Sequence, residues 1–122
     1  MSDYQMGAVE SRFADIIWEK EPLSSAELAR LAEDSLGWKK STTYTVLKRL
    51  CDKGIFKNEG GTVTSVISRG DFYSKRSEIF VNEEFGGSLP SFLAAFTSRK
   101  KLSREEVAEL RRMVEGFEKE QK

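Results

Sequence analysis

The sequence predicts a mainly α-helical protein with a small β-hairpin, in which a winged helix-turn-helix is followed by a C-terminal helical region. Three observations predict this class. Apolar residues recur with helical spacing in three segments before Gly54, their period changes from 3.6 to 2 after it, and helical spacing returns after residue 71. The 122 residues therefore divide into a winged-helix domain over residues 1–70 and a helical region over residues 71–122.

The first two helices are predicted from their apolar faces and their boundaries. The first extends over residues 8–20 and ends before a Glu-Pro pair. The second begins at a capping box, with Ser24 as the N-cap and Glu27 three positions later. Leu23 and Leu28 stand at the two positions of a hydrophobic staple, which fixes the direction in which the chain enters the second helix.

The third helix, over residues 41–53, has two chemically different faces. Ser41 is its expected N-cap, and Gly54 stands where a helix ends. The face with apolar spacing holds Thr43, Val46, Leu47, Leu50 and Cys51. The opposite face holds Ser41, Thr42, Thr45, Lys48, Arg49 and Asp52. We expect the first face to pack on a core and the second to face solvent or a partner.

The polar face of this helix is suited to double-stranded DNA. Its hydroxyl groups and cations match base edges and phosphates, and two lysines precede it at the positive end of the helix dipole. The candidate DNA-binding residues are Lys39, Lys40, Ser41, Thr42, Tyr44, Thr45, Lys48, Arg49 and Lys57. The alternative is a solvated helix face that happens to be basic, because short basic helices are common.

A β-hairpin is predicted directly after the third helix. Residues 55–58 and 62–67 are rich in β-branched and aromatic side chains, and the Gly60-Gly61 pair between them favours a tight turn. Three helices followed by a hairpin are in the order of a winged helix-turn-helix. The hairpin is weakly basic, with Lys57 on its first strand and Arg69 beyond its second, so we expect its contribution to phosphate binding to be minor.

Charge is distributed unevenly along the chain, although the formal net charge is zero. Residues 1–37 hold three basic and eight acidic side chains, which gives a net charge of −5. Residues 38–57 hold six basic side chains and one acidic one, which gives +5. A basic helix on an acidic domain attracts phosphate on one face and repels it elsewhere, which indicates a protein that binds a defined DNA site.

Several classes of function are disfavoured by what the sequence lacks. It has no histidine and a single cysteine, Cys51, so it offers neither the commonest general base nor a cluster of metal ligands. It has no glycine-rich phosphate loop and no nucleophile motif. We therefore expect no enzyme activity, no catalytic residue, no metal site and no cofactor. The absence of a long apolar run and of a signal peptide predicts a cytoplasmic protein with no membrane partner.

The C-terminal third contains three predicted helices with large apolar faces. Gly86 ends the first, Pro90 is tolerated in the first turn of the second, and Ser103 forms a capping box with Glu106 at the start of the third. The residues expected at a dimer interface are Phe80, Leu89, Phe92, Leu93, Phe96, Val107, Leu110, Val114 and Phe117. The region over residues 71–122 is therefore predicted to be a dimerisation region.

An interdigitated homodimer is the arrangement that would bury these apolar faces. Three short helices cannot bury them among themselves, and a dimer would also place two DNA-binding helices about a two-fold axis. The alternative is that they pack on the winged-helix domain of the same chain. We favour the homodimer because DNA-binding proteins of this size usually need two half-sites for useful affinity.

Four segments together resemble the penicillinase-repressor family (BlaI/MecI/CopY type) of winged-helix transcriptional regulators. They are Glu10–Trp18, Thr42–Gly54, Phe85–Phe96 and Leu102–Val107, and the resemblance covers residues 6–118. The motif Thr-x-x-Thr-x-x-x-Arg-Leu followed by Lys-Gly is moderately specific alone, and the later Gly-Gly-Ser segment in the right order makes the match strong.

The resemblance implies a bacterial homodimeric repressor that binds a palindromic DNA operator through the helix over residues 41–53. Thr42, Thr45 and Arg49 would lie on the side that contacts DNA. A function of another class is also open, namely a winged-helix interaction module whose basic helix docks on an acidic protein partner. The hydroxyl groups of Thr42 and Thr45 favour DNA, because a purely electrostatic protein contact has no need of them.

The resembled family also suggests two modes of induction, and this chain departs from both. In the antibiotic-resistance branch, a signal from a membrane sensor ends in cleavage of an Asn-Phe bond, which makes a regulatory protease a candidate partner. The corresponding bond here is Ala95–Phe96, so the residue before the bond differs and cleavage is disfavoured. The copper-responsive branch carries a C-terminal cysteine cluster, which this sequence lacks, so copper sensing through that motif is not expected.

Overall fold

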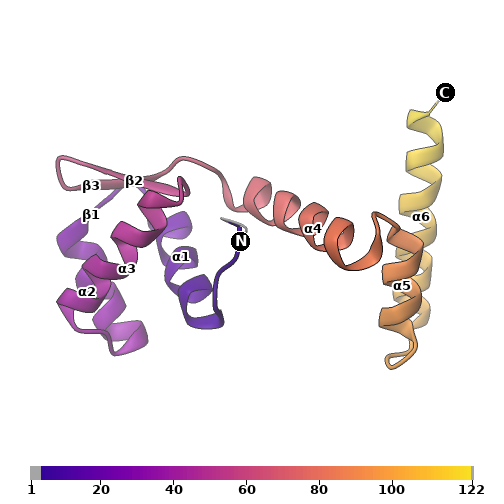
Figure 1. Ribbon diagram of the computed structural model, residues 1–122, viewed down its shortest axis with the longest axis horizontal. Helices are drawn as coiled ribbons and strands as arrows, with labels where there is room; N and C mark the ends of the chain where they lie inside the picture. Colours follow the sequence, from indigo (N-terminus) through magenta and orange to yellow (C-terminus); the bar gives the residue numbers. More distant parts are fainter. Residues whose placement is uncertain (1–3, 122) are drawn as a thin grey trace. The chain divides into compact units, whose positions relative to one another are not determined.

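The computed structural model describes residues 4–121, which form six helices and three short strands (Figure 1). In chain order the elements are α1 (Ala8–Lys20), β1 (Leu23–Ser24), α2 (Ser25–Leu36), α3 (Lys40–Asp52), β2 (Phe56–Glu59), β3 (Thr62–Ser65), α4 (Arg69–Phe85), α5 (Leu89–Thr97) and α6 (Arg104–Glu120). The predicted class, mainly helical with a small β-hairpin, is confirmed. Across this range no helix has the length and apolar character needed to span a membrane.

The chain divides into two compact units. The first extends to Ile79 and the second begins at Phe80, so the division falls inside α4. The first unit contains the three helices and the hairpin that the sequence predicts for a winged helix-turn-helix. Each unit has its own packing and is described separately.

The sheet of the first unit has the strand order β1-β3-β2, and its pairs are antiparallel. β2 and β3 form the predicted hairpin, in which Gly60 and Gly61 have φ angles of 58° and 88°. Glycine fits this turn because a side chain makes such a left-handed backbone unfavourable. β1 has no counterpart in the sequence prediction, since it is two residues long and pairs Leu23 with the distant Val63.

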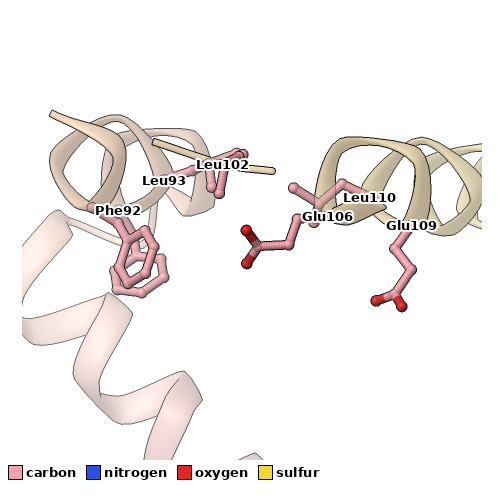
Figure 2. Close-up of a pocket in the computed structure, with 7 residues that line it drawn as sticks. Phe92, Leu93, Leu102, Glu106, Glu109 and Leu110 are labelled. Atoms are coloured by element: carbon pink, nitrogen blue, oxygen red, sulfur yellow. The ribbon is translucent and has the colours of Figure 1, made fainter. Parts of the chain in front are cut away.

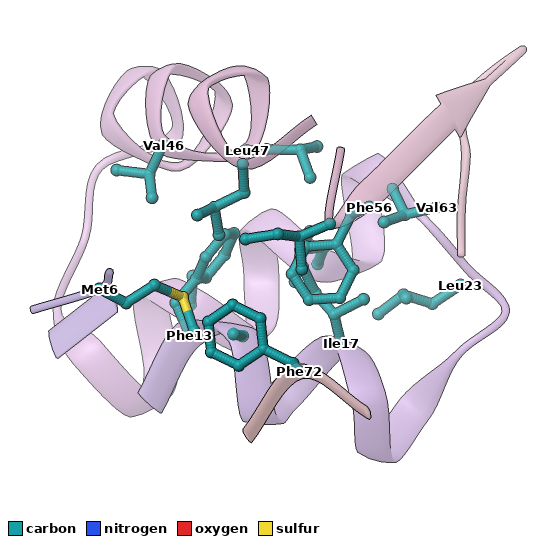
Figure 3. Packing of buried hydrophobic residues seen from close by; sticks show 14 residues of the cluster. Met6, Phe13, Ile17, Leu23, Val46, Leu47, Phe56, Val63 and Phe72 are labelled. Carbon is teal, nitrogen blue, oxygen red and sulfur yellow. The ribbon is translucent and has the colours of Figure 1, made fainter. Parts of the chain in front are cut away.

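The core of the first unit is built from α1, α2, α3, the sheet and the start of α4 (Figure 3). Its largest fully buried apolar side chains are Phe13, Ile17, Leu28, Leu50, Phe56, Val63 and Phe72. Phe72 lies on α4, and its ring centroid is 5.6 Å from that of Trp18 on α1. The first turn of α4 is therefore part of this core, so the first unit extends beyond residue 70, where the predicted winged-helix domain ends.

Both predicted capping serines are confirmed. The Ser24 hydroxyl accepts a hydrogen bond from the backbone N–H of Glu27 at 3.0 Å, although α2, whose residues are all described, forms only this half of the capping box. At the start of α6, Ser103 accepts from the Glu106 N–H at 3.0 Å and the Glu106 carboxylate accepts from the Ser103 N–H at 2.9 Å. This reciprocal pair satisfies two backbone donors that the helix itself leaves free.

The start of α3 differs from its prediction. Lys39 rather than Ser41 is the N-cap, and Ser41 lies in the first helical turn. The preceding Trp38 packs on Phe13 of α1, with ring centroids 5.0 Å apart. This tertiary contact holds the chain just before Lys39, and local capping preference alone does not contain it.

The second unit contains the end of α4 together with α5 and α6. Gly86 and Gly87, both with positive φ, make the turn between α4 and α5. The rings of Phe80, Phe85 and Phe92 form a cluster with centroid separations of 5.6 to 6.1 Å. All residues of α5 and α6 are described, and none of them is fully buried. These helices therefore leave much of their apolar surface accessible.

Candidate nucleic-acid interface

α3 has the two faces that its sequence predicts. On the apolar side, Thr43, Val46, Leu47 and Leu50 are buried and Cys51 is half-buried against the core. On the polar side, the exposed residues are Ser41, Thr42, Thr45, Lys48, Arg49 and Asp52. The helix is held by one face, and its hydroxyl groups and cations are directed away from the core.

Cys51 has the properties of a small core residue. Burial, and after it the negative charge of Asp52, raises the pKa of its thiol above the ordinary value. The thiol therefore stays protonated at neutral pH, which suits packing better than metal binding or nucleophilic chemistry. Among residues 4–121, no three side chains of the usual metal-binding types lie close enough together to hold an ion.

The N-terminal end of α3 combines positive charge with free backbone donors. The first N–H groups of an α-helix lack partners within the helix, and the N-cap Lys39 supplies no side-chain bond to them. Lys39 and Lys40 are exposed, and Lys40 Nζ lies 5.8 Å from the centroid of the Tyr44 ring. This end of the helix therefore attracts anionic groups such as phosphate.

The two cations in the second half of α3 are held differently. Lys48 Nζ lies 3.5 Å from Asp52 Oδ2 on the same helix, and these side chains are 80% and 69% exposed. Arg49 Nη1 lies 3.4 Å from Glu10 Oε2 on α1, and here the exposed fractions are 52% and 23%. Arg49 is thus tied to a neighbouring helix while half of its side chain stays accessible.

Thr45 uses its hydroxyl hydrogen within α3. Its Oγ1 donates to the carbonyl oxygen of Ser41 at 2.9 Å. The oxygen lone pairs and the methyl group are left for contacts outside the protein. A threonine in this state can accept from the amino group of adenine or cytosine, or touch the methyl group of thymine.

The hairpin supplies less charge than the sequence suggests. Lys57 Nζ lies 2.9 Å from Glu59 Oε1 on the same strand, with both side chains mostly exposed. Arg69, placed beyond the hairpin by the sequence, begins α4 and donates from Nε to Asp15 Oδ1 at 2.9 Å. This hydrogen bond and the charge of Asp15 raise the pKa of Arg69. Arg69 therefore joins α4 to α1 instead of extending the basic surface of the hairpin.

Glu10 on α1 contacts the polar face of α3, and the sequence alone does not predict this contact. Its Oε1 accepts from the Gly7 backbone N–H at 3.4 Å, and its Oε2 faces Arg49. Glu10 and Arg49 are 39 positions apart. An acidic residue in the first turn of a helix is an ordinary capping signal, so nothing local to either residue predicts their contact.

Most residues predicted for dimerisation are exposed in the second unit. Phe92 and Leu110 are half-buried, and the exposed ones are Phe80, Leu89, Leu93, Phe96, Val107, Val114 and Phe117. A groove of about 240 Å³ lies between α5 and α6, with apolar side chains from both helices and the carboxylates of Glu106 and Glu109 along it (Figure 2). The interface itself stays a prediction.

The Ala95–Phe96 bond, which the resemblance places at the family's cleavage position, lies near the end of α5. Ala95 and Phe96 are both exposed, with Phe96 44% accessible. Their backbone is helical, and the Thr97 hydroxyl donates to the Leu93 carbonyl at 2.8 Å across this turn. The side chains are accessible in a single chain, whereas a protease would have to open the helix to reach the bond.

Comparisons with known proteins agree with this geometry. A sequence model of the penicillinase-repressor family matches residues 6–116. The methicillin resistance regulatory protein MecI of Staphylococcus aureus strain Mu50 is 27% identical over 115 residues, which cover 91% of this chain and 94% of the relative. The penicillinase repressor of Bacillus licheniformis is 27% identical over 122 residues, 97% of this chain and 95% of the relative.

A third relative, the penicillinase repressor of Staphylococcus aureus, is 27% identical over 109 residues and covers 86% of each chain. Proteins of this family are DNA-binding transcriptional repressors and not enzymes. Because the family match includes the winged helix and α4 to α6, it applies to nearly the whole chain. The chain belongs to the penicillinase-repressor family of transcriptional repressors.

Proposed function

We propose that this repressor binds a palindromic DNA operator as a homodimer and contacts the bases with α3. The observation that carries the proposal is the separation of the two faces of α3. Its polar residues are exposed while the opposite side is buried in the core. A helix supported in this way can enter the major groove, which is wide enough to admit it, without disturbing the fold behind it.

The residues of this surface divide by the chemistry that they offer to DNA. Lys39 and Lys40, together with the free N–H groups at the start of α3, are placed to bind phosphate. Arg49 can donate two hydrogen bonds to O6 and N7 of guanine, and Lys48 suits a phosphate. The hydroxyl and aromatic groups of Ser41, Thr42, Tyr44 and Thr45 complete the surface of α3, with Lys57 on the hairpin.

The homodimer is supported by the apolar surface of the second unit. Phe80, Leu89 and Phe117 are among large apolar side chains that are about half exposed. Several large apolar side chains that stay exposed within one small unit indicate an interaction site in soluble proteins. A second copy supplies a self-complementary partner, because an isologous dimer uses the same surface on both chains.

Selection of bound sequences from a random duplex pool tests the operator. We expect a consensus made of two inverted half-sites, whose centres are about 34 Å, or one helical turn, apart or a multiple of this distance. Sedimentation of the purified protein with and without the consensus duplex then tests whether two chains bind together. A consensus without inverted symmetry, or one chain per duplex at saturation, would exclude the dimeric mode of binding.

A further inference from the structure

One ion pair links α3 to another element of the first unit. Among the ion pairs formed within residues 4–121, only Arg49–Glu10 connects α3 to a different helix, because Lys48 pairs with Asp52 of α3 itself. Among the proposed DNA-binding residues, Arg49 alone offers a planar set of N–H donors on a long side chain. How Arg49 is held therefore bears on how the helix discriminates between sequences.

Glu10 is the fixed partner in this pair. It stands at the third position of α1, where its Oε1 accepts from the Gly7 N–H at 3.4 Å. Its side chain is far less exposed than that of Arg49. The carboxylate is thus held by the start of α1 and directs the guanidinium through Nη1 at 3.4 Å, while the remaining Arg49 donors stay available.

We propose that Glu10 is a specificity-determining residue of this repressor, which orients Arg49 and cancels its charge towards phosphate. The inference rests on the proposed function of α3. An arginine paired with a carboxylate keeps directional N–H donors for a base edge, but the pair as a whole carries no net charge. It therefore adds to discrimination between base pairs and adds little to the sequence-independent attraction between protein and DNA.

The Lys48–Asp52 pair lacks these properties. Both of its side chains are mostly exposed and belong to one helix, so the pair exchanges easily with solvent and with phosphate. Lysine is also a compact charge on a flexible stem, whereas a fixed guanidinium presents a planar set of donors. Lys48 is thus suited to phosphate in any sequence, and Arg49 to one base pair.

The charge-cancelling role predicts a change in salt dependence when Glu10 becomes neutral. Glu10→Gln frees one cation on the DNA-binding surface and retains a side chain that can cap α1. Each added phosphate contact steepens the plot of log K against log salt by about 0.9. If parent and Glu10→Gln bind unrelated DNA equally at 1 M salt, the steeper slope makes the variant bind it about fivefold more tightly than the parent at 0.15 M salt.

The experiment compares two duplexes of equal length, the consensus from the random-pool selection and a scrambled sequence. Affinities of the full chain and of Glu10→Gln are measured between 0.05 M and 0.3 M salt, a range of roughly this size being enough to define the slope. For Glu10→Gln we expect the slope for the scrambled duplex to steepen by about 0.9 and the ratio of consensus to scrambled affinity to fall about fivefold. Glu10→Ala should give the same changes and in addition a lower thermal midpoint, because it also removes the cap.

Two matched controls separate this role from a change in net charge. Glu19→Gln removes one negative charge from an exposed position of α1 that forms no ion pair within the described chain. We expect it to leave the affinity ratio unchanged. In an Arg49→Ala background, Glu10→Gln should have no more effect than Glu19→Gln, because the cation that it would release is absent.

The outcomes separate this inference from the proposed function. If Arg49→Ala binds the consensus as tightly as the parent, α3 is not used as proposed and the role of Glu10 falls with it. If Arg49→Ala weakens consensus binding while Glu10→Gln behaves like Glu19→Gln in ratio and slope, the proposed function stands and the role of Glu10 is overturned. A steeper slope that persists in the Arg49→Ala background would also overturn it.

Discussion

Phe117 offers the sharpest quantitative test of the proposed homodimer. It lies on α6 and is 49% exposed in the chain. A phenylalanine side chain can bury about 200 Å², so a dimer could remove roughly 100 Å² of Phe117 surface from water on each chain. At about 25 cal/mol per Å², this contributes about 2.5 kcal/mol per copy and about 5 kcal/mol to a symmetric dimer.

Phe117→Ala should therefore weaken the dimer by between about three and four orders of magnitude, since 1.4 kcal/mol corresponds to a factor of ten. The measurement is sedimentation equilibrium over a wide concentration range. Circular dichroism checks that α6 stays helical, as we expect because alanine favours helices. Arg112→Ala is the matched control, since Arg112 is exposed and lies on the opposite side of α6 from Val114 and Phe117.

Two results would refute this reasoning. The first is a parent protein that sediments as a monomer at micromolar concentration. The second is a Phe117→Ala variant with the same dimer dissociation constant as Arg112→Ala. In the stronger variant with Leu110 and Phe117 both replaced by Asp, we expect a monomer that retains the winged-helix fold but loses high-affinity operator binding, because each half-site is then bound separately.

Three further predictions follow from the interface and the core. Arg49→Ala should cost about 1–3 kcal/mol of operator binding and relax the preference at one base pair. Lys48→Ala should weaken binding to all duplexes alike and reduce the salt slope by about 1. Competition binding at several salt concentrations distinguishes the two variants, and undiminished operator binding by Arg49→Ala would contradict the assignment of α3. Phe72→Ala should lower the free energy of unfolding by about 3–5 kcal/mol because Phe72 is fully buried in the core of the first unit. Urea unfolding of the full chain measures this loss. A loss below about 1 kcal/mol would mean that the start of α4 is not part of the core. We expect the Ala95–Phe96 bond to stay intact in derepressed cells, because alanine replaces the asparagine of the resembled branch and the bond lies inside α5. Mass spectrometry of the repressor recovered from these cells checks this. A fragment ending at Ala95 would point instead to a regulatory protease.

The parts of the fold that were predictable from the sequence depend on residues close together along the chain. The two faces of α3 follow from helical spacing. Ser24 and Ser103 cap helices through bonds to residues three positions later, and Gly60-Gly61 forms its turn within the hairpin. In each case the interacting groups are four or fewer positions apart, so the local pattern contains the information needed.

The sequence left open every feature that depends on contacts between distant elements. β1 exists because Leu23 pairs with Val63, and the chain just before α3 is held by Trp38 packing on Phe13. Phe72 is buried in the core of the first unit, which its position in the sequence does not predict.

The pairing of Arg49 with Glu10 is of the same kind. Helical spacing puts Arg49 on the exposed face of α3, and the predicted range of the first helix puts Glu10 near its start, but the two residues are 39 positions apart. The sequence therefore determined which groups this repressor can offer to DNA. Only the tertiary structure decided which of them is held in place, because that depends on a carboxylate brought to the guanidinium by the packing of the whole unit.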